Sequence, residues 1–267
     1  EGLTRAPRQA ELLRRLGEAA GGELTRDALS EVEQVTVRDR ESLKVLEEVG
    51  VQREITVTAD PALLLQGEPV PEGTLRREGL DGRRRLVAMS VREPGKAAPD
   101  IDDEHYHELL ANATDYMVDR FDAEVVFVPM ERSKYDVQHS HAVVSRMLRA
   151  QQAVVLRGEY TPGQVLNLMG HFKFAVGMRL HFLIFAALKR VPFVALPYSS
   201  KVGSFLEELH LDFPPLKQVN AGRLLAYIDH SWDHRQILRE QIERLLPPLQ
   251  QRALETHRIA VQMLKER

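Results

Sequence analysis

The sequence predicts an α/β protein made of two Rossmann-like domains, in which helices cover both faces of doubly wound parallel sheets. Short apolar runs recur along the chain and interleave regularly with segments of helical period, as in βαβ units. The runs are continuously apolar rather than alternating, which is typical of parallel strands buried on both faces. A length of 267 residues allows one large domain or two small ones.

Residues 1–66 are assigned to the first domain, although they contain only two clear strands. In chain order, we expect helices over 9–20 and 27–33, a strand that ends at Val37, a helix after Asp39 and a strand over 54–59. Asp39 can cap its helix, and Gly50 can end it. Two strands are too few to close a sheet for a segment of this length, so we expect the chain to begin inside this domain.

The stretch 67–84 is rich in glycine, proline and charge and has no period, so it is interpreted as an interdomain linker. The second domain, 85–267, alternates strand and helix and ends in a charged helical tail from residue 221. Its strands are expected over 85–91, 124–129, 153–156, 174–176 and 192–196, followed by helices over 102–121, 135–150 and 162–169, from about Arg179, and from Lys201. We expect the two domains to face each other across a cleft.

Composition argues against several classes of function. The formal net charge is −3 and the isoelectric point is near 6.4, so no bulk attraction for nucleic acid or anionic lipid is expected. Cysteine is absent, which excludes disulfides and thiolate metal sites. The longest uncharged part of the most apolar stretch, Leu180–Leu188, is far short of the ~20 residues that span a membrane. No P-loop or GxGxxG motif is present, which argues against ordinary nucleotide or dinucleotide chemistry.

Three polar residues are expected to converge at the carboxyl edge of the second sheet. With the strand order 3-2-1-4-5, the first and fourth strands flank the point where the order reverses, and ligands of such sheets bind there. Arg92 follows the first strand, and Arg179 and His181 follow the fourth. A helix N-terminus and an arginine both suit a phosphate or a carboxylate, so an anion site is predicted. Leu180, between the two, should point inward.

Each of these polar residues also has a purely structural interpretation. Arg179 could pair with a nearby carboxylate, and His181 could be a hydrogen-bonded core histidine. Arg38 follows a strand and precedes a capped helix in the first domain, so it too could face the cleft. Its alternative is a pair with Asp39 or Glu41.

Other residues carry weaker signals. Tyr198 and Lys201 lie after the fifth strand and could form a wall of the substrate site, although a solvated loop explains them equally well. His139 and His141 are two positions apart on an expected helix, a spacing that suits one metal ion poorly. No metal is therefore assigned, and no cofactor is expected.

At this point the sequence resembles the polysaccharide pyruvyl transferase family, above all its bacterial cell-wall, CsaB-like branch. The resemblance runs from about Val35 to Leu211 through the blocks "VTVRDRESLKVLEEVGV", "ITVTADPALLL", "LVAMSVRE", "VVFVPM" and "VGMRLHFLIFAALKRVPFVALPYSSKVGSFLEELHL". The "GMRLH" block is the most specific of these. Residues 131–141 depart from the expected acidic loop, because they keep Asp136 but add two histidines.

The resemblance implies a two-domain fold of the GT-B type and transfer of a pyruvyl group from phosphoenolpyruvate to a hexose, forming a 4,6-ketal. It implies that Arg179 and Leu180 belong to the phosphoenolpyruvate site and that His181 is catalytic. A second arginine, Arg38 or Arg92, would help to hold the anion. The chemistry requires no metal.

For the cell-wall branch, the resemblance implies a lipid-linked acceptor that contains N-acetylmannosamine, whose product anchors S-layer proteins. A cytoplasmic protein is expected, with contact at the inner face of the membrane and self-association left open. Two rival functions remain: a GT-B glycosyltransferase that uses a nucleotide sugar, and a non-catalytic family member that binds a saccharide.

Overall fold

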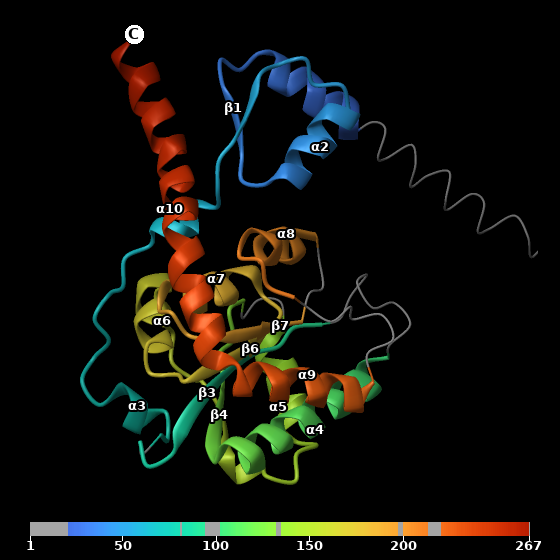
Figure 1. Ribbon diagram of the computed structural model, residues 1–267, viewed down its shortest axis with the longest axis vertical. Coiled ribbons are helices and arrows are strands. Elements are labelled where there is room, and N and C mark those ends of the chain that lie inside the picture. Colours follow the sequence, from blue (N-terminus) through green and yellow to red (C-terminus); the bar gives the residue numbers. More distant parts are fainter. Residues whose placement is uncertain are drawn as a thin grey trace, which may run out of the picture. The chain divides into compact units, whose positions relative to one another are not determined.

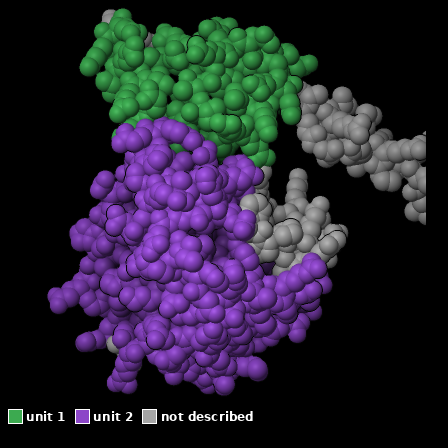
Figure 2. All heavy atoms as spheres, in the orientation of Figure 1, with its two compact units in different colours: residues 1–60, 253–267 green, residues 61–252 purple. Residues whose placement is uncertain are grey.

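The computed structural model describes residues 21–80, 82–93, 102–131, 135–196, 200–212 and 220–266 (Figure 1). The chain divides into two compact units, coloured separately in Figure 2: unit 1 contains residues 1–60 and 253–267, and unit 2 contains residues 61–252. The expected linker, 67–84, lies within unit 2 and includes helix α3, Thr74–Arg77. The domain division made from the sequence stays a prediction.

Unit 2 is built on a five-stranded parallel sheet. Its strands are β3 (Arg85–Ser90), β4 (Ala123–Phe127), β5 (Ala153–Val155), β6 (Phe174–Gly177) and β7 (Phe193–Ala195). They lie in the order β5-β4-β3-β6-β7, and every pair of neighbours is parallel. The predicted 3-2-1-4-5 order is therefore confirmed, and it places β3 and β6 side by side at the point where the order reverses.

Helices cover both faces of this sheet (Figure 1). They are α4 (Asp103–Phe121), α5 (Asp136–Val144), α6 (Pro162–Met169), α7 (Leu180–Leu188), α8 (Ser200–Glu208), α9 (Ala221–Asp233) and α10 (Arg235–Lys265), the last of which supplies residues to both units. The predicted α/β class with parallel sheets is confirmed. In the described part of the chain, every helix is too short or too polar to span a bilayer.

The main core of unit 2 lies between the sheet and helices α4 and α9. Phe121 of α4 stacks on Trp232 of α9 with ring centroids 4.0 Å apart, and Phe174 of β6 meets the same indole edge-on at 5.7 Å. All three side chains are buried. Aromatic pairs in these geometries add about 0.5–1.5 kcal/mol each to the effect of burial alone. This packing holds α4 and α9 together and against β6.

Residues 61–80 are held against the loop that joins β5 to α6. Glu78 is buried, and its carboxylate accepts hydrogen bonds from the backbone N–H groups of Arg157 and Gly158 and from the Tyr160 hydroxyl. These hydrogen bonds lower the pKa of Glu78 against the opposing effect of its burial. A Cβ on Gly158 would lie 2.6 Å from the Tyr160 hydroxyl, so glycine is required for the close approach.

Unit 1 contains a two-stranded parallel sheet of β1 (Val35–Val37) and β2 (Ile55–Val57), joined by helix α2 (Arg40–Glu48). The predicted cap is confirmed, because the Asp39 carboxylate accepts a hydrogen bond from the Ser42 N–H at 2.7 Å. Thr256 of α10 donates to Thr58, which follows β2. The two ends of the chain therefore contribute to the same unit.

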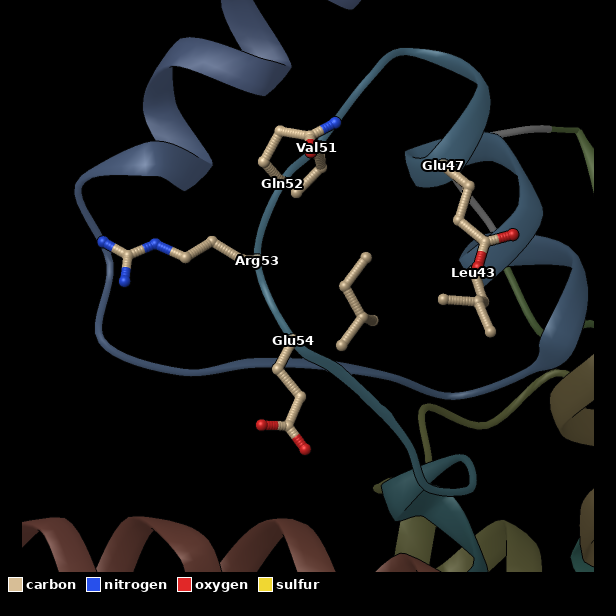
Figure 3. Close-up of a pocket in the computed structure, with 7 residues that line it drawn as sticks. Leu43, Glu47, Val51, Gln52, Arg53 and Glu54 are labelled. Carbon is tan, nitrogen blue, oxygen red and sulfur yellow. The ribbon is translucent and has the colours of Figure 1, made fainter.

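An open hollow lies on unit 1 between α2 and the residues that lead into β2. Figure 3 shows Leu43 and Glu47 on α2 facing the segment 51–54. Arg53 points away from the hollow, and its guanidinium donates to the Ser30 carbonyl. The hollow therefore presents mainly aliphatic and carboxylate groups, unlike an anion site.

Most predicted elements are found within a few residues of their expected bounds. The helix expected over 9–20 lies outside the described residues, and the one expected over 27–33 is helical over 21–30 instead. The helix expected over 135–150 ends at Val144 because the Asp115 carboxylate accepts hydrogen bonds from the N–H groups of Leu148 and Arg149. That side chain on α4 redirects the backbone where the local pattern still favours helix.

Gly177 is the last residue of β6, and the reason for glycine there is space rather than backbone conformation. Its φ lies outside the left-handed region, but a Cβ would come within 2.3 Å of the Phe182 ring. Phe182 and Gly177 are both buried. The Phe182 ring of α7 therefore packs directly against the last residue of β6.

We expect Gly177→Ala to lower the free energy of unfolding by about 1–3 kcal/mol, because the added methyl overpacks the contact with Phe182. Chemical denaturation measures the change. Gly170→Ala is the matched control, since a Cβ there meets only ordinary contacts of 3.4 Å or more. In a Phe182→Ala background the same substitution should cost much less, and an unchanged cost would contradict this account.

Candidate active site

The candidate site lies where the chain leaves β3 and β6. Ser90 is in register with Gly177, and the Met178 N–H donates to the Ser90 carbonyl at 3.2 Å. Arg92 and Arg179 each follow two residues after this registered pair. The two segments that the sequence predicted to meet are thus adjacent at the carboxyl edge of the sheet.

Tyr106 of α4 connects these two segments. Its buried hydroxyl donates to the Arg92 carbonyl at 2.9 Å and also contacts the sulfur of Met178. Burial raises the pKa of Tyr106 strongly; the Arg92 charge opposes this shift and the Asp136 charge adds to it. The hydroxyl therefore stays protonated and keeps its donor role at any physiological pH.

Arg179 is the N-cap residue of α7 and is buried in a cluster of carboxylates. Its Nε and Nη2 donate to the two oxygens of Asp136 at 3.1 and 2.5 Å, and its Nη1 donates to Glu131 at 2.8 Å. The carboxylate pairing that the sequence left open for Arg179 is therefore present. Its part in binding a ligand stays a prediction.

Asp136 is the central acceptor of this cluster. It is the first residue of α5 and is fully buried. One of its oxygens also accepts the backbone N–H groups of Met130 and Glu131, at 3.2 and 3.0 Å. A buried carboxylate needs this many donors, because desolvation is compensated only when its lone pairs are occupied.

Of the other two residues of the "RLH" block, one lies in the core and one at the surface. Leu180 is buried, which confirms that it points inward. His181 is exposed at the second position of α7, and among the described residues it has no hydrogen-bond or ion-pair partner. The His181 imidazole is therefore accessible to solvent, whereas the neighbouring Arg179 guanidinium is buried and held rigidly. The core-histidine interpretation does not fit this exposure.

The two candidate second arginines lie in different units. Arg92 is partly buried in unit 2, and its Nη2 pairs with Glu93 at 3.2 Å. Arg38 lies in unit 1, where its Nη1 pairs with Asp60 at 3.0 Å and its Nε lies 3.4 Å from Asp39. Arg92 thus shares the carboxyl edge with Arg179, while the role of Arg38 stays a prediction.

Of the expected substrate wall, Tyr198 lies outside the described residues. Lys201 is exposed in the first turn of α8. Its side chain is accessible, and its contribution to a substrate site stays a prediction.

A histidine pair that the sequence reasoning missed lies beside this cluster. His107 of α4 and His139 of α5 are joined by a hydrogen bond of 2.8 Å between their ring nitrogens. Only one of the two drew attention in the sequence, because their separation of 32 positions has no pattern that links them. Among the described residues, no group of three or more acidic or histidine side chains could hold a metal ion.

The position of the pair explains a lowered pKa at His107. Burial lowers the pKa first, followed by the charges of His139 and Arg146, and Asp103 opposes them. Since His139 is one helical turn from Asp136, the pair supports the start of α5 from the side of α4.

Comparison with known proteins identifies a family and a fold. The sequence profile of a family described as polysaccharide pyruvyl transferase matches residues 18–200. This range includes Arg38, Arg92, Arg179 and His181. A search of curated protein sequences finds no match to the chain.

Several solved structures share the fold at low sequence identity. Anabaena Alr3699/HepE, in complex with UDP and glucose, has a TM-score of 0.60 and 15% identity, with 92% of this chain and 67% of that chain covered. A Listeria monocytogenes protein assigned as a UDP-N-acetylglucosamine 2-epimerase has a TM-score of 0.59 and 14% identity, with coverages of 88% and 61%. Sucrose-phosphate synthase from Thermosynechococcus elongatus has a TM-score of 0.56 and 14% identity, with coverages of 92% and 62%.

These likenesses agree with the predicted GT-B-like class with two Rossmann-like domains. The chain spans about three fifths of the length of the Listeria monocytogenes protein. At this level of identity the likeness establishes the fold and leaves the chemistry to the residues of the site.

We expect Asp136→Asn to lower the free energy of unfolding by about 3–5 kcal/mol, because it leaves the Arg179 charge buried without its anionic partner. Denaturant titration measures the loss. Asp119→Asn is the matched control, since it breaks an exposed pair with Arg149 and should have a far smaller effect. Equal effects of the two substitutions would contradict the assignment of Asp136 as the central acceptor.

The lowered pKa of His107 predicts a stability that rises with pH. Below the ordinary value of 6.5 the unfolded chain binds a proton that the folded chain resists. Stability should therefore fall as the pH drops from about 6.5 to the lowered pKa, and then level off. Urea unfolding across this range should show the decline in the parent chain and in His141→Gln, and a smaller one in His107→Gln. An undiminished decline in His107→Gln would assign the effect to another group.

Proposed function

The chain belongs to the polysaccharide pyruvyl transferase family, and we propose that it transfers a pyruvyl group from phosphoenolpyruvate to a hexose of a polysaccharide precursor. The observation that carries the proposal is the position of the "RLH" block. It lies within the stretch that matches the family and at the carboxyl edge where the strand order reverses. Ligands of open parallel sheets bind at this edge.

The donor suits a site of this charge. Phosphoenolpyruvate carries a phosphate and a carboxylate, so it needs several cationic or N–H donors. Arg179 supplies a guanidinium, and the start of α7 supplies backbone N–H groups. Arg92 or Arg38 would supply the second cation.

Glu131 would have to be replaced when the anion binds. The Asp136 side chain is fully buried, whereas the Glu131 side chain is 37% exposed. The hydrogen bond between Arg179 Nη1 and Glu131 can therefore break without movement of a buried carboxylate. Asp136 would keep hold of Nε and Nη2, so the guanidinium would stay in place while one of its donors turned to the ligand.

The chemistry also needs a group that gives and takes a proton. Protonation of the methylene carbon of phosphoenolpyruvate makes C2 electrophilic, and a sugar hydroxyl then attacks C2. Phosphate leaves with its bonding electrons, and a neighbouring hydroxyl closes the cyclic ketal as two hydroxyl protons are released. One of these protons replaces the proton given to the methylene carbon. We assign the proton-transfer role to His181, because it is exposed beside Arg179 and histidine titrates near neutral pH.

The acceptor follows from the resemblance to the cell-wall branch. We propose a lipid-linked saccharide that contains N-acetylmannosamine, pyruvylated at O4 and O6 at the inner face of the membrane, with a product that anchors S-layer proteins. Phosphate release from phosphoenolpyruvate, measured with a panel of N-acetylhexosamine acceptors, tests the reaction. Turnover of UDP-sugars without phosphoenolpyruvate would instead support the glycosyltransferase alternative, and binding without turnover would support a saccharide-binding protein.

We expect His181→Gln to lower kcat by about 10²–10⁴-fold, because a glutamine cannot transfer the proton. The phosphate-release assay measures the loss. The melting temperature should not change, since the side chain is exposed. His171→Gln, at an exposed histidine before β6, is the control and should keep full activity. Full turnover by a folded His181→Gln enzyme would reject the assigned role.

A further inference from the structure

One buried hydroxyl at the carboxyl edge of the sheet has no hydrogen-bond partner among the described residues. Ser90 is 2% exposed, and its Oγ forms no hydrogen bond with any described residue. Buried hydroxyls are nearly always paired, because an unpaired one has lost its bonds to water without replacement. Ser90 is not among the candidate site residues that were predicted from the sequence.

The place of Ser90 in the sheet is central. It is the last residue of β3, in register with Gly177 of β6, and its carbonyl accepts the Met178 N–H. It is therefore one residue from the start of the loop that carries Arg92, and its neighbour Gly177 is two residues from Arg179.

The alternation of side chains along β3 gives the face on which Ser90 lies. Val87, Met89 and Val91 belong to the core cluster that includes α4 and α9. Ser90 therefore points to the opposite face. Registered residues of neighbouring strands share a face, and the Cβ direction of Gly177 meets the Phe182 ring of α7. The Ser90 hydroxyl accordingly lies on the face that the first turn of α7 covers.

The start of α7 offers backbone donors of its own. Arg179 is the N-cap residue, but it makes no side-chain capping hydrogen bond to the first turn. The first N–H groups of a helix have no partner within the helix. The Ser90 hydroxyl and these backbone N–H groups therefore lie on the same face of the sheet, at its carboxyl edge, and both are hydrogen-bond donors.

We propose that the Ser90 hydroxyl donates a hydrogen bond to an anionic oxygen of the bound donor substrate, beside the N–H groups of the first turn of α7. This inference rests on the proposed function, because it takes phosphoenolpyruvate as the ligand. It adds a binding residue from the central strand to a site otherwise formed by the "RLH" block. The bound ligand would supply the hydrogen-bond acceptor for this hydroxyl.

Isothermal titration calorimetry with phosphoenolpyruvate tests the inference on the whole chain. Ser90→Ala should raise Kd at least about tenfold, because hydrogen bonds to charged groups are among the strong ones. The melting temperature of the free protein should stay the same or rise, since the substitution removes a hydroxyl that has no partner. Thr114→Val is the control: its buried hydroxyl donates to the Leu110 carbonyl on α4, and its loss should leave Kd unchanged.

The outcomes separate the two proposals. If the parent chain binds phosphoenolpyruvate and Ser90→Ala binds it equally well, the inference about Ser90 is overturned and the proposed function stands. The inference is also overturned if Ser90→Ala lowers the melting temperature of the free protein and leaves Kd unchanged, because the hydroxyl is then a structural one. If the parent chain does not bind phosphoenolpyruvate, the proposed function fails, and the inference fails with it.

Discussion

The hydrogen-bonded ion pair between Asp136 and Arg179 is the interaction on which the rest of the candidate site depends. Neither charge could be buried alone, because desolvation of a single ion far exceeds the gain from packing. Together they tie the first residue of α5 to the N-cap of α7. The ion pair thus joins the N-terminal ends of two helices that belong to different βαβ units. The loop that follows β4 is held in the same way, through the Met130 and Glu131 N–H groups.

A rigid cation of this kind suits recognition of a small, doubly charged donor. The guanidinium keeps its orientation because two of its nitrogens stay bound to a carboxylate that has no room to move. Preorganised donors of this sort need no rearrangement as charge develops during reaction. Tyr106 serves the same end by tying the chain after β3 to the chain after β6. The neutral hydroxyl does so without adding a charge to the cluster.

The sequence predicted the elements whose cause is local and missed the contacts whose cause is distant. Continuous apolar runs and the Asp39 cap are local signals that predict strands and helices, and the strand order was the usual one of a doubly wound sheet. The adjacency of the segments that carry Arg92 and Arg179 followed from that order. The His107–His139 pair could not be predicted, nor could the choice of Asp136 as the partner of Arg179, because each contact joins helices that only the finished sheet brings together. The need for glycine at position 177 is of the same distant kind, because it comes from the Phe182 ring of α7.

Unit 1 is formed by two segments that flank unit 2 in the chain, and this has a consequence for folding during translation. Unit 2 is continuous from residue 61 to 252, so all its strands have left the ribosome before residue 253 is added. Residues up to 60 precede unit 2 in the chain, yet the Thr58–Thr256 hydrogen bond can form only after residue 256 has been added. The usual order of vectorial folding, in which the N-terminal part is completed first, is thus reversed for this unit. The part of unit 1 that is made before unit 2 completes its contacts only after unit 2 has been made.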